Sequence, residues 1–590
     1  MISNSEIARV FSEIAEYLEM QNVPFKPRAY EKVAEVIEGI SEEISELYKR
    51  GGLKALEEIP GVGLSIAEKI EELLKTGRSK QHEALKKELP VDLSSFNGVE
   101  GLGPKGIFTL YKKLGIRNLK DLEKAAKVGK IRKIEGFGEK SEENILKGIE
   151  FTKKSGGRFV LGSIMPKIRE IENRLKNLKE VQKIMVAGSV RRRKETIGDC
   201  DILVISEKPK SVMDYFISMP EVARVFAHGE TKSAVKLANG LDVDLRVVQE
   251  KSYGAALNYF TGSKDHNIAL REIAIKKGYK LNEYGIFSTK GGSLPAGGRG
   301  ASGGKGFKQI AGRTEEEIYK NLGLEYIEPE MRENTGEIEL AKEKKLPKLI
   351  NYGDLKGDLQ IQTNWTDGAN SIEEMAEAAV KLGLKYIAIT DHTKRLAMIG
   401  GLDEKKIKRQ WKEIDAMNKK MAGKIKILKG TECDILKDGT LDLPDKILEK
   451  LDVVGVSIHS YFNLSRADQT KRIERAIRNK NVDILFHPTG RIINKRPAYE
   501  LDLTKIIKTA KETGTVLEID AFPDRLDLKD NHIRQCVEAR VKLTIDSDAH
   551  SINHLSYLEY GLAQARRGWA KKNDIINTWE VKKMMSFLKK

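Results

Sequence analysis

The stretch 188–201, GSVRRRKETIGDCD, constrains the fold more than any other part of the chain, because it sets two carboxylates beside an apolar run. That run, DILVIS, is rich in β-branched residues and is typical of a buried strand. Side chains two residues apart on a strand project from the same face, so Asp199 and Asp201 are predicted to point into one space. Two converging carboxylates suit a hard cation such as Mg²⁺, which keeps several waters beside substrate phosphates.

A small turn precedes the two aspartates. Gly188 and Ser189 offer backbone N–H groups and a hydroxyl to a phosphate, and a cluster of arginines follows them. Together with the carboxylates, this turn indicates nucleotidyl transfer, in which two metal ions hold the attacking and the leaving oxygens. The alternative is a solvated strand edge with two exposed acids. The D-x-D pattern alone favours that alternative, and the turn with its arginines reverses the preference.

The length and charge of the chain limit its domain organisation and its partners. A chain of 590 residues is too long for one core, so we expect several domains. The formal charge of +17 favours a polyanionic partner, although a lysine-rich solvated surface would give the same charge. Three cysteines without CxxC pairing predict no disulfides and a reducing compartment. The sequence has neither a signal peptide nor an apolar run of about 18 residues, so we expect a cytoplasmic protein with no membrane partner.

A short glycine pattern occurs three times in the first 150 residues. Each copy reads apolar-x-Gly-apolar-Gly and enters a helical pattern: IPGVGLSIAEKIEELL, VEGLGPKGIFTLYKKL and IEGFGEKSEENIL. Such turns bring backbone N–H groups at a helix start close to a phosphate, and they position a nucleic-acid backbone without reading bases. The alternative is a set of tight helix–helix turns, which three copies in a basic half-chain make improbable. The glycines concerned are Gly61, Gly63, Gly101, Gly103, Gly136 and Gly138.

The glycine repeat resembles the helix-hairpin-helix motif, and its combination with the stretch 188–201 resembles DNA polymerase family X over residues 1–335. The resemblance implies a gap-filling repair polymerase that takes gapped or primer–template DNA and dNTPs, with Mg²⁺ or Mn²⁺ as cofactor. It also implies a third metal-binding carboxylate on the run GLDVDLRVV: Asp244, with Asp242 on the same face as the fallback. A template-independent transferase and a non-catalytic DNA-binding scaffold are the alternatives.

The motif YFTGSKDHNIALR, residues 259–271, matches the same family closely. The residues that the resemblance implies for nucleotide binding are Gly188, Ser189, Arg192, Tyr259, Phe260, Gly262 and Asn267. Those implied for template or DNA contact are Arg246 and Arg271, together with the six glycines of the repeat. We expect Arg191 and Arg193 to be solvated or to contact duplex phosphates, because adjacent residues on a turn cannot all converge on one triphosphate.

One lysine has two interpretations. In the run IAEKI, Lys69 stands where repair members of the family place a Schiff-base lysine, and Tyr30 fits the pattern of their lyase pocket. A nucleophilic amine needs a lowered pKa, which burial or the cations Lys26 and Arg28 would supply. The alternative, a phosphate-binding or solvated lysine, is slightly favoured.

The second half of the chain has a different pattern of predicted strands and helices. Short β-branched strands (KYIAIT, DVVGVSIH, VDILFH, TVLEID, KLTIDS) alternate with helical patterns, which predicts parallel α/β units or a barrel. Carboxylates and imidazoles follow the strand ends, and in such folds the strand ends converge on one rim. Imidazole with carboxylate suits Zn²⁺ or Mn²⁺. The residues concerned are His392, Glu432, His459, His487, Asp548 and His550.

This half resembles the polymerase-and-histidinol-phosphatase (PHP) domain over residues 351–590, which implies a 3′–5′ exonuclease or phosphoesterase. The family's first motif is ordinarily His-x-His, whereas this chain has Gln360 and Gln362. The resemblance implies one metal held by that motif with Glu432 and Asp548; amide ligands should bind it poorly. A second set (Glu432, His459, His487) and a third (Asp367, His392, His550) look intact. Asp520 stands where a neutral residue is more usual, so a two-metal site and a non-catalytic scaffold both stay open.

The resulting fold prediction is a multidomain chain: an α-helical helix-hairpin-helix region, an α/β nucleotidyltransferase palm and thumb, and a C-terminal α/β barrel-like PHP domain. We place the domains at 1–90 (lyase-like, with the first hairpin), 91–157 (fingers), 158–250 (palm), 251–335 (thumb), 336–350 (linker) and 351–590 (PHP). The glycine-rich stretch 291–307 is expected to be a loop inserted in the thumb. We expect a monomer.

Overall fold

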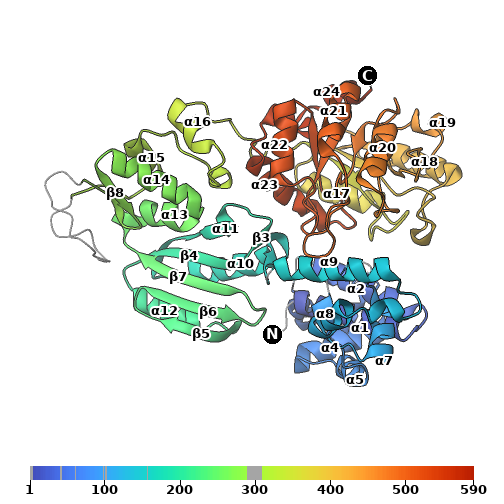
Figure 1. Ribbon diagram of the computed structural model, residues 1–590, viewed down its shortest axis with the longest axis horizontal. Helices are drawn as coiled ribbons and strands as arrows, with labels where there is room; N and C mark the ends of the chain where they lie inside the picture. The colour runs from blue at the N-terminus through green and yellow to red at the C-terminus, as the bar shows by residue number, and fades with distance from the viewer. Residues whose placement is uncertain are drawn as a thin grey trace.

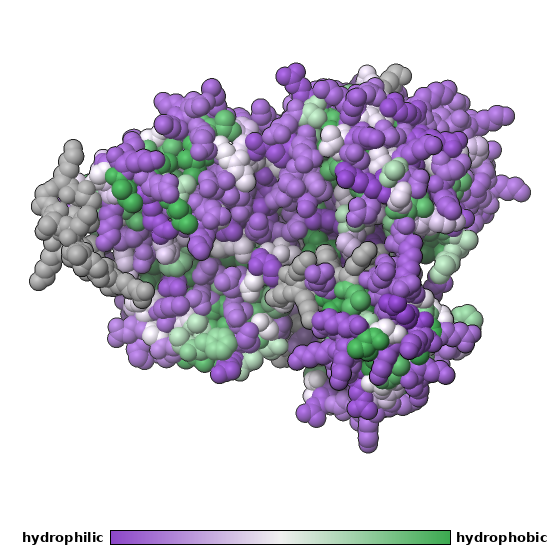
Figure 2. All heavy atoms as spheres, viewed as in Figure 1, coloured by the Kyte–Doolittle hydropathy of each residue, from purple (hydrophilic) through white to green (hydrophobic). Residues whose placement is uncertain are grey.

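The computed structural model describes residues 4–39, 43–59, 61–96, 99, 102–155, 157–288 and 308–589. The loop predicted at 291–307 and the predicted DNA-binding Gly101 lie outside the described residues. Figure 1 shows a helical N-terminal part, a central sheet with its associated helices, and a C-terminal barrel. Hydrophilic side chains cover most of the face in Figure 2, and only small, separate apolar patches interrupt them.

In the N-terminal part, the regular elements of the described residues are all helices, and they share one continuous core. Apolar side chains from Ile7 on the first helix to Ile149 on the last belong to the same buried cluster, so the predicted domains 1–90 and 91–157 pack as one unit. Among the described residues, no helix is long and apolar enough to cross a membrane. The helices are α1 (Asn4–Met20), α2 (Lys26–Gly39), α3 (Ile44–Glu57), α4 (Leu64–Thr76), α5 (Lys80–Glu88), α6 (Leu93–Phe96), α7 (Pro104–Leu114), α8 (Leu119–Lys127), the 3₁₀ turn η1 (Ile131–Lys133) and α9 (Glu139–Ser155).

The central sheet has the strand order β2-β4-β7-β6-β5, in which β4 and β7 are parallel and the other pairs antiparallel. Alternation of side chains separates its two faces. Cys200, Ile202 and Val204 pack toward α10 and α12, whereas Leu203 and Ile205 pack toward α13. The elements are β1 (Phe159–Val160), α10 (Leu161–Lys176), β2 (Val181–Val186), α11 (Gly188–Arg191), β3 (Thr196–Ile197), β4 (Asp199–Ser206), α12 (Pro209–Ile217), β5 (Val222–His228), β6 (Lys232–Leu237) and β7 (Asp242–Val248).

A thumb-like segment follows the sheet. Its core extends into 336–350, which was predicted to be a linker: Ile338 and Ala341 of helix α16 are buried there, because their spacing presents one apolar face to the thumb. The elements are η2 (Glu250–Ser252), α13 (Tyr253–Thr261), α14 (Lys264–Lys276), β8 (Tyr279–Asn282), β9 (Gly285–Ser288), β10 (Gln309–Ala311), α15 (Glu315–Leu322), η3 (Pro329–Met331) and α16 (Glu337–Glu343).

The C-terminal half confirms the predicted barrel. Seven parallel strands follow one another in sequence order, and a bridge between Ile361 and Ala549 brings the first and last strands together. The strands are β11 (Gly357–Ile361), β12 (Tyr386–Ile389), β13 (Lys426–Asp434), β14 (Val453–Ser457), β15 (Ile484–Leu485), β16 (Val516–Asp520) and β17 (Leu543–Asp546). The α-helices around them are α17 (Ile372–Lys381), α18 (Glu404–Lys420), α19 (Asp445–Leu448), α20 (Arg466–Ile477), α21 (Leu503–Thr513), α22 (Asp530–Ala539), α23 (Leu558–Arg567) and α24 (Val581–Leu588). The 3₁₀ turns are η4 (Ala397–Ile399), η5 (His554–Tyr557), η6 (Lys572–Asp574) and η7 (Ile576–Thr578).

The barrel is docked on the palm. Its residues Ile493, Leu526 and Tyr560 belong to the same apolar cluster as the palm strands and α10. Ion pairs border this contact, with Arg169 of α10 bound to Glu559 at 2.6 Å and Arg491 bound to Glu195 at 2.7 Å. The two halves therefore share both apolar and charged contacts.

Candidate active sites

Two adjacent parallel strands bring the palm carboxylates together. In the β4–β7 register, Asp199 lies opposite Asp242 and Asp201 lies opposite Asp244. Residues paired across a parallel ladder project from the same face, so all four carboxylates lie on the face that carries Leu203 and Ile205. The predicted trio of Asp199, Asp201 and Asp244 thus shares one side of the sheet.

The charges around Asp201 fit a bound cation. Burial, together with repulsion from Asp199 and Asp244, raises the pKa of this carboxyl to about 6, against the attraction of Arg246 and Lys232. Clustered carboxylates that repel one another are stabilised when a divalent ion lies between them, and oxygen ligands suit Mg²⁺. These side chains therefore fit the metal that the resemblance implies.

Asp242 and Asp244 differ in their partners. Asp242 is half-exposed and forms an ion pair with Lys236 at 2.6 Å. Asp244 is less exposed and lies 3.1 Å from Lys232 and 3.5 Å from Arg246. Because Asp244 lies opposite Asp201, whose pKa it raises, Asp244 is the better placed of the two to share an ion with Asp201.

A polar cavity of about 480 Å³ lies beside the carboxylates and collects most of the sequence-predicted residues. Gly188 has a positive φ of 63°, and a Cβ there would stand 3.0 Å from the Asp201 carboxylate, so the turn needs glycine to approach the site. The lining residues are Arg158, Gly188, Ser189, Arg192, Asp199, Asp201, Tyr259, Phe260, Gly262, Lys264, Asn267 and Arg271.

The arginines after the turn have separate partners. Arg192 lines the cavity; its Nε lies 3.1 Å from Glu333, and one Nη donates to the carbonyl oxygen of Thr261. The expectation for Arg191 is wrong, because its guanidinium binds both carboxylate oxygens of Glu315, at 2.6 and 3.0 Å, and is largely buried. Arg193 lies over the ring of Tyr352, 5.8 Å from its centre.

The α13–α14 junction forms the opposite wall of the cavity. The Asn267 amide donates to the carbonyl oxygen of Tyr259 at 2.7 Å, which fixes the end of α13 against the start of α14. Arg246 stacks on Phe260 at 4.4 Å and also reaches Asp244, so it links this wall to the carboxylates. Arg246 therefore lies beside the carboxylates.

Sequence reasoning missed several cavity residues. Lys264 stands inside the motif 259–271 directly after its glycine turn, and that position was the available signal. Arg158 is the first residue of the predicted palm and carries no pattern that would single it out. Arg567 of α23 was not predicted either, although it donates to the carbonyl oxygen of Arg192 at 2.8 Å and to Glu333 at 3.0 Å.

The glycine turns of the helical part face solvent. Gly63 and Gly103 directly precede α4 and α7, and no atom lies within 4 Å of where a Cβ would be on either residue. Gly61 and Gly136 have φ values of 83° and 88°, which favour glycine. Gly138 precedes α9 and is equally open. The described members of the repeat thus leave helix starts free to approach a phosphate backbone.

The two candidate lyase residues have different surroundings. Lys69 donates from Nζ to the carbonyl oxygen and the hydroxyl of Ser65, each at 2.9 Å, within its own helix. Tyr30 is buried and donates to Gln81 at 2.9 Å. Lys69 is therefore held in the second turn of α4, and both a phosphate-binding and a nucleophilic role fit this position.

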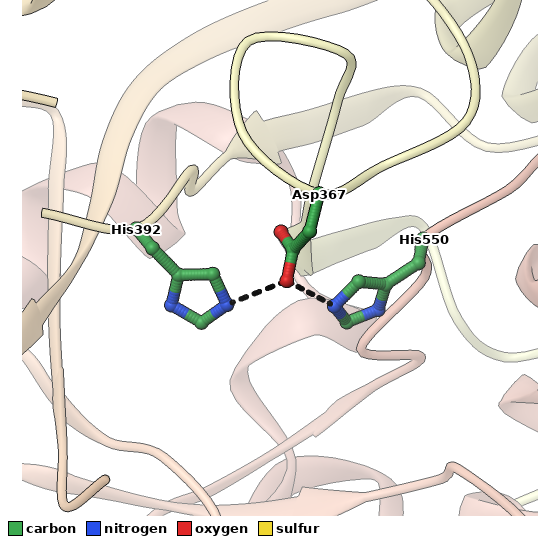
Figure 3. Close-up of side chains that lie close together, drawn as sticks. All are labelled: Asp367, His392 and His550. Atoms are coloured by element: carbon green, nitrogen blue, oxygen red, sulfur yellow. Dashed lines mark ion pairs between the residues drawn. The ribbon is translucent and has the colours of Figure 1, made fainter. Parts of the chain in front are cut away.

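In the barrel, Asp367, His392 and His550 form a first cluster (Figure 3). The Asp367 carboxylate lies 3.6 Å from Nε2 of each histidine. Ligand atoms about 3.4 Å apart form one edge of a tetrahedron around an ion with bonds of about 2.1 Å, so this spacing fits Zn²⁺ or a similar ion. Burial would raise the pKa of Asp367, but His550 and His392 outweigh it and lower that pKa to about 2.

A second cluster surrounds Glu432. Its Oε1 lies 3.1 Å from His459 Nε2 and 2.8 Å from His487 Nε2, and its Oε2 lies 3.5 Å from His392 Nδ1. Burial would lower the pKa of His459, but the carboxylates of Asp434 and Glu432 outweigh it and raise that pKa to about 9. The predicted set of Glu432, His459 and His487 is thus brought together, and His392 joins it to the first cluster.

The first metal position of the family pattern does not fit an ion in this chain. Gln360 and Gln362 donate from their amide nitrogens to Oε2 of Glu432, at 3.1 and 2.8 Å. Asp548, the fourth predicted ligand there, lies 3.6 Å from the guanidinium of Arg525. The unusual Asp520 lies 3.4 Å from the same guanidinium. The two glutamine amides and the Arg525 guanidinium thus bind the carboxylates that this metal would need as ligands.

Fold and sites together define a metal-dependent nucleotidyltransferase that carries a second, hydrolase-like centre. Residues 256–333 match the family described as DNA polymerase beta thumb, and residues 2–79 and 93–150 match two helix-hairpin-helix families. Residues 358–521 match the PHP domain.

Whole-chain similarity gives the family. The DNA polymerase/3′-5′ exonuclease PolX of Bacillus subtilis (strain 168) is 38% identical over 588 residues, 99% of each chain. A probable phosphatase of Thermoanaerobacter sp. (strain X514) is 32% identical over 232 residues, 37% of this chain and 88% of that protein. Leishmania infantum polymerase beta, in a ternary primer–template complex, is 24% identical with a TM-score of 0.27, covering 42% of this chain and 98% of that one. The chain belongs to the family X DNA polymerases with a C-terminal PHP domain.

Proposed function

We propose that the chain is a DNA-directed DNA polymerase of the gap-filling type, which acts in base excision repair on gapped or primer–template DNA with dNTPs. The observation that carries the proposal is the register of β4 and β7, which sets Asp199, Asp201 and Asp244 on one face beside a polar cavity. The whole-length similarity to a named polymerase supports the same assignment.

The side chains of the cavity have distinct roles in this proposal. Asp199, Asp201 and Asp244 would hold Mg²⁺ or Mn²⁺, ions that lower the pKa of the primer 3′-hydroxyl and offset charge on the leaving pyrophosphate. Backbone amides at Gly188 and Ser189, with the Arg192 guanidinium, would bind the triphosphate as charge-assisted donors. Tyr259, Phe260 and Gly262 would form the wall next to the sugar of the incoming nucleotide.

Contacts to DNA come from the helical part and from the cavity rim. The open glycine turns before α4, α7 and α9 would bind phosphates through backbone amides, and Arg271 would contact the template strand. Such binding releases counterions, so affinity should fall steeply with salt.

Primer extension on labelled gapped DNA tests the polymerase. We expect extension with Mg²⁺ or Mn²⁺ and dNTPs, and no extension by Asp199→Ala, which should still bind the gapped DNA. Extension by that variant at the wild-type rate would refute the assignment of the carboxylates.

For the barrel we propose a 3′–5′ exonuclease that acts on the same DNA. The observation that favours it is the pair of clusters joined through His392, which present imidazole and carboxylate ligands suited to Zn²⁺ or Mn²⁺. Shortening of the labelled primer when dNTPs are omitted is the test. The variant His550→Ala should lose the shortening and keep gap filling, whereas shortening that disappears in Asp199→Ala would assign it to the palm.

The lyase reaction is proposed only at Lys69, whose place on α4 after the first glycine turn matches the family pattern. Borohydride trapping of the protein on DNA with an abasic site is the test. A covalent adduct that disappears in Lys69→Ala would support the Schiff base, and an adduct that persists would exclude Lys69.

A further inference from the structure

A second cavity, of about 510 Å³, lies at the meeting of the helical part and the barrel. Asn144 of α9 contributes one side, and Lys437, Tyr461, Phe462 and Arg496 of the barrel contribute the other. In Figure 1, α9 runs directly below the barrel. Neither the polymerase site nor the metal clusters include these residues.

Tyr461 is the most unusual residue of this cavity. Its side chain is 45% exposed, which is high for a large aromatic ring. Three cationic groups surround the ring, with Lys437, Arg472 and Arg395 at 5.5, 5.9 and 6.0 Å from its centre. An accessible aromatic face among cations matches the composition of surfaces that bind single-stranded nucleic acid, where bases stack and phosphates find positive charge.

The backbone holds Tyr461 in this position. Arg472 is almost fully buried, and its guanidinium donates to the carbonyl oxygens of Leu436 and Ser460, each at 2.8 Å, and to that of Ile435. Tyr461 itself has a φ of 57°, a conformation that non-glycine residues seldom adopt. The segment before the ring is therefore anchored, and the ring is presented to solvent in a fixed place.

Phe462 lines the same cavity but is partly buried against the barrel core. The Arg496 guanidinium lies over its ring at 4.3 Å, and Tyr499 stacks against it with ring centres 6.4 Å apart. Phe462 therefore supports the cation Arg496 beside Tyr461, whose exposed ring supplies the place for a base. Duplex DNA hides the faces of its bases, so this surface suits an unpaired strand.

Tyr461 is close in sequence to the second metal cluster, because it follows His459 by two residues. His459 contacts Glu432 at 3.1 Å and Asp434 at 3.2 Å. A base stacked on the Tyr461 ring would therefore bring the end of its strand near the cluster, and a substrate without bases would gain nothing from the ring.

We propose that Tyr461 forms a stacking platform that binds the single-stranded 3′ end of DNA and leads it to the histidine–carboxylate clusters of the barrel. The proposal rests on the exonuclease function proposed above, because it names the substrate of that centre. The charged residues Lys437, Arg395 and Arg496 contact the phosphates of the same strand.

Photocrosslinking tests the platform without requiring hydrolysis. The probe is a gapped DNA with a short 3′ single-stranded tail, whose last nucleotides are 5-iododeoxyuridine joined by phosphorothioates. With the full chain, we expect crosslinks that mass spectrometry maps to Tyr461. The yield at this site should fall at least fivefold in Tyr461→Ala and should be retained in Tyr461→Phe.

The control is Tyr215→Ala, which removes a tyrosine of α12 that is 36% exposed on the palm. It should crosslink like the wild type. Crosslinks that map only to the helical part, or a yield unchanged in Tyr461→Ala, would overturn the proposal. A chain that crosslinks at Tyr461 but never shortens the unmodified tail would refute the exonuclease function and still support the platform, so the two failures are distinguishable.

Discussion

Gln362 donates a hydrogen bond to Glu432 across 2.8 Å, at a position where the family pattern has a metal-binding histidine. Gln360 donates to the same carboxylate oxygen at 3.1 Å. Two amide donors therefore occupy Oε2 of Glu432 and leave Oε1 for His459 and His487. The barrel centre keeps two clusters of ligands and replaces the third with hydrogen bonds.

The double variant Gln360→His with Gln362→His should bind about one more metal ion per chain than the wild type. Imidazole is a strong ligand for Zn²⁺ and Mn²⁺, whereas a neutral amide oxygen is a weak one. The measurement is metal content by mass spectrometry after dialysis against Zn²⁺ and then against metal-free buffer. Adding Glu432→Gln to the double variant should abolish the gain. An unchanged metal content would mean that Arg525 beside Asp548 excludes the ion by itself.

Arg567→Met should raise KM for dNTPs about three- to tenfold, equivalent to roughly 1 kcal/mol, with a smaller change in kcat. Arg567 neutralises Glu333 and donates to the carbonyl oxygen of Arg192. Without it, Glu333 should attract Arg192 more strongly and compete with the triphosphate. Steady-state kinetics on gapped DNA measure the effect.

The matched control for that measurement is Arg566→Met, at the neighbouring position of α23. Arg566 binds Glu330 at 2.8 Å and the carbonyl oxygen of Ile350 at 2.8 Å instead of the arginine turn. If both variants raised KM equally, the effect would come from general loosening of the barrel contact.

Local sequence patterns predicted Asp199 and Asp201 because their signals lie within the single stretch 188–201. The two-residue period of a strand sets Asp199 and Asp201 on one face, and the glycine turn lies earlier in the same stretch. The same holds for the barrel, whose ligands follow strand ends. These signals need only the geometry of one strand and its neighbour.

Partners far apart in sequence could not be predicted in this way. Arg191 was expected at the surface, yet it pairs with Glu315, 124 residues away, and Arg567 reaches Arg192 across 375 residues. Nothing in the sequence around an arginine indicates which distant carboxylate will neutralise it. The role of α16 was missed for a related reason, since a lysine-rich composition hid the two apolar residues that pack on the thumb.

Glu315→Gln should lower the free energy of unfolding by about 3–5 kcal/mol, because it leaves two buried guanidiniums without their shared carboxylate. Arg332 is fully buried and Arg191 largely so, and both bind Glu315. Denaturant unfolding with a probe in the thumb measures the loss. Glu559→Gln, which breaks the partly exposed pair with Arg169, should cost at most about 1 kcal/mol. Equal losses in the two variants would contradict the buried pairing.

Asp201→Asn should stabilise the metal-free protein at neutral pH. The pKa of Asp201 is raised to about 6 by burial and by repulsion from Asp199 and Asp244, so the folded state holds this proton more tightly than the unfolded chain does. The free energy of unfolding is then highest below about pH 4 and falls as pH rises through about 6, by at most about 3 kcal/mol. The variant lacks this loss, so in chelator the two proteins should differ at pH 7.5 and converge near pH 4.

The control variant Glu207→Gln, on an exposed side chain after β4, should show no such difference from the wild type. Adding Mg²⁺ at pH 7.5 should stabilise the wild type more than Asp201→Asn, because an ionised carboxylate binds the ion and an amide does so only weakly. A wild type as stable in chelator at pH 7.5 as at pH 5 would show that the three carboxylates do not repel one another.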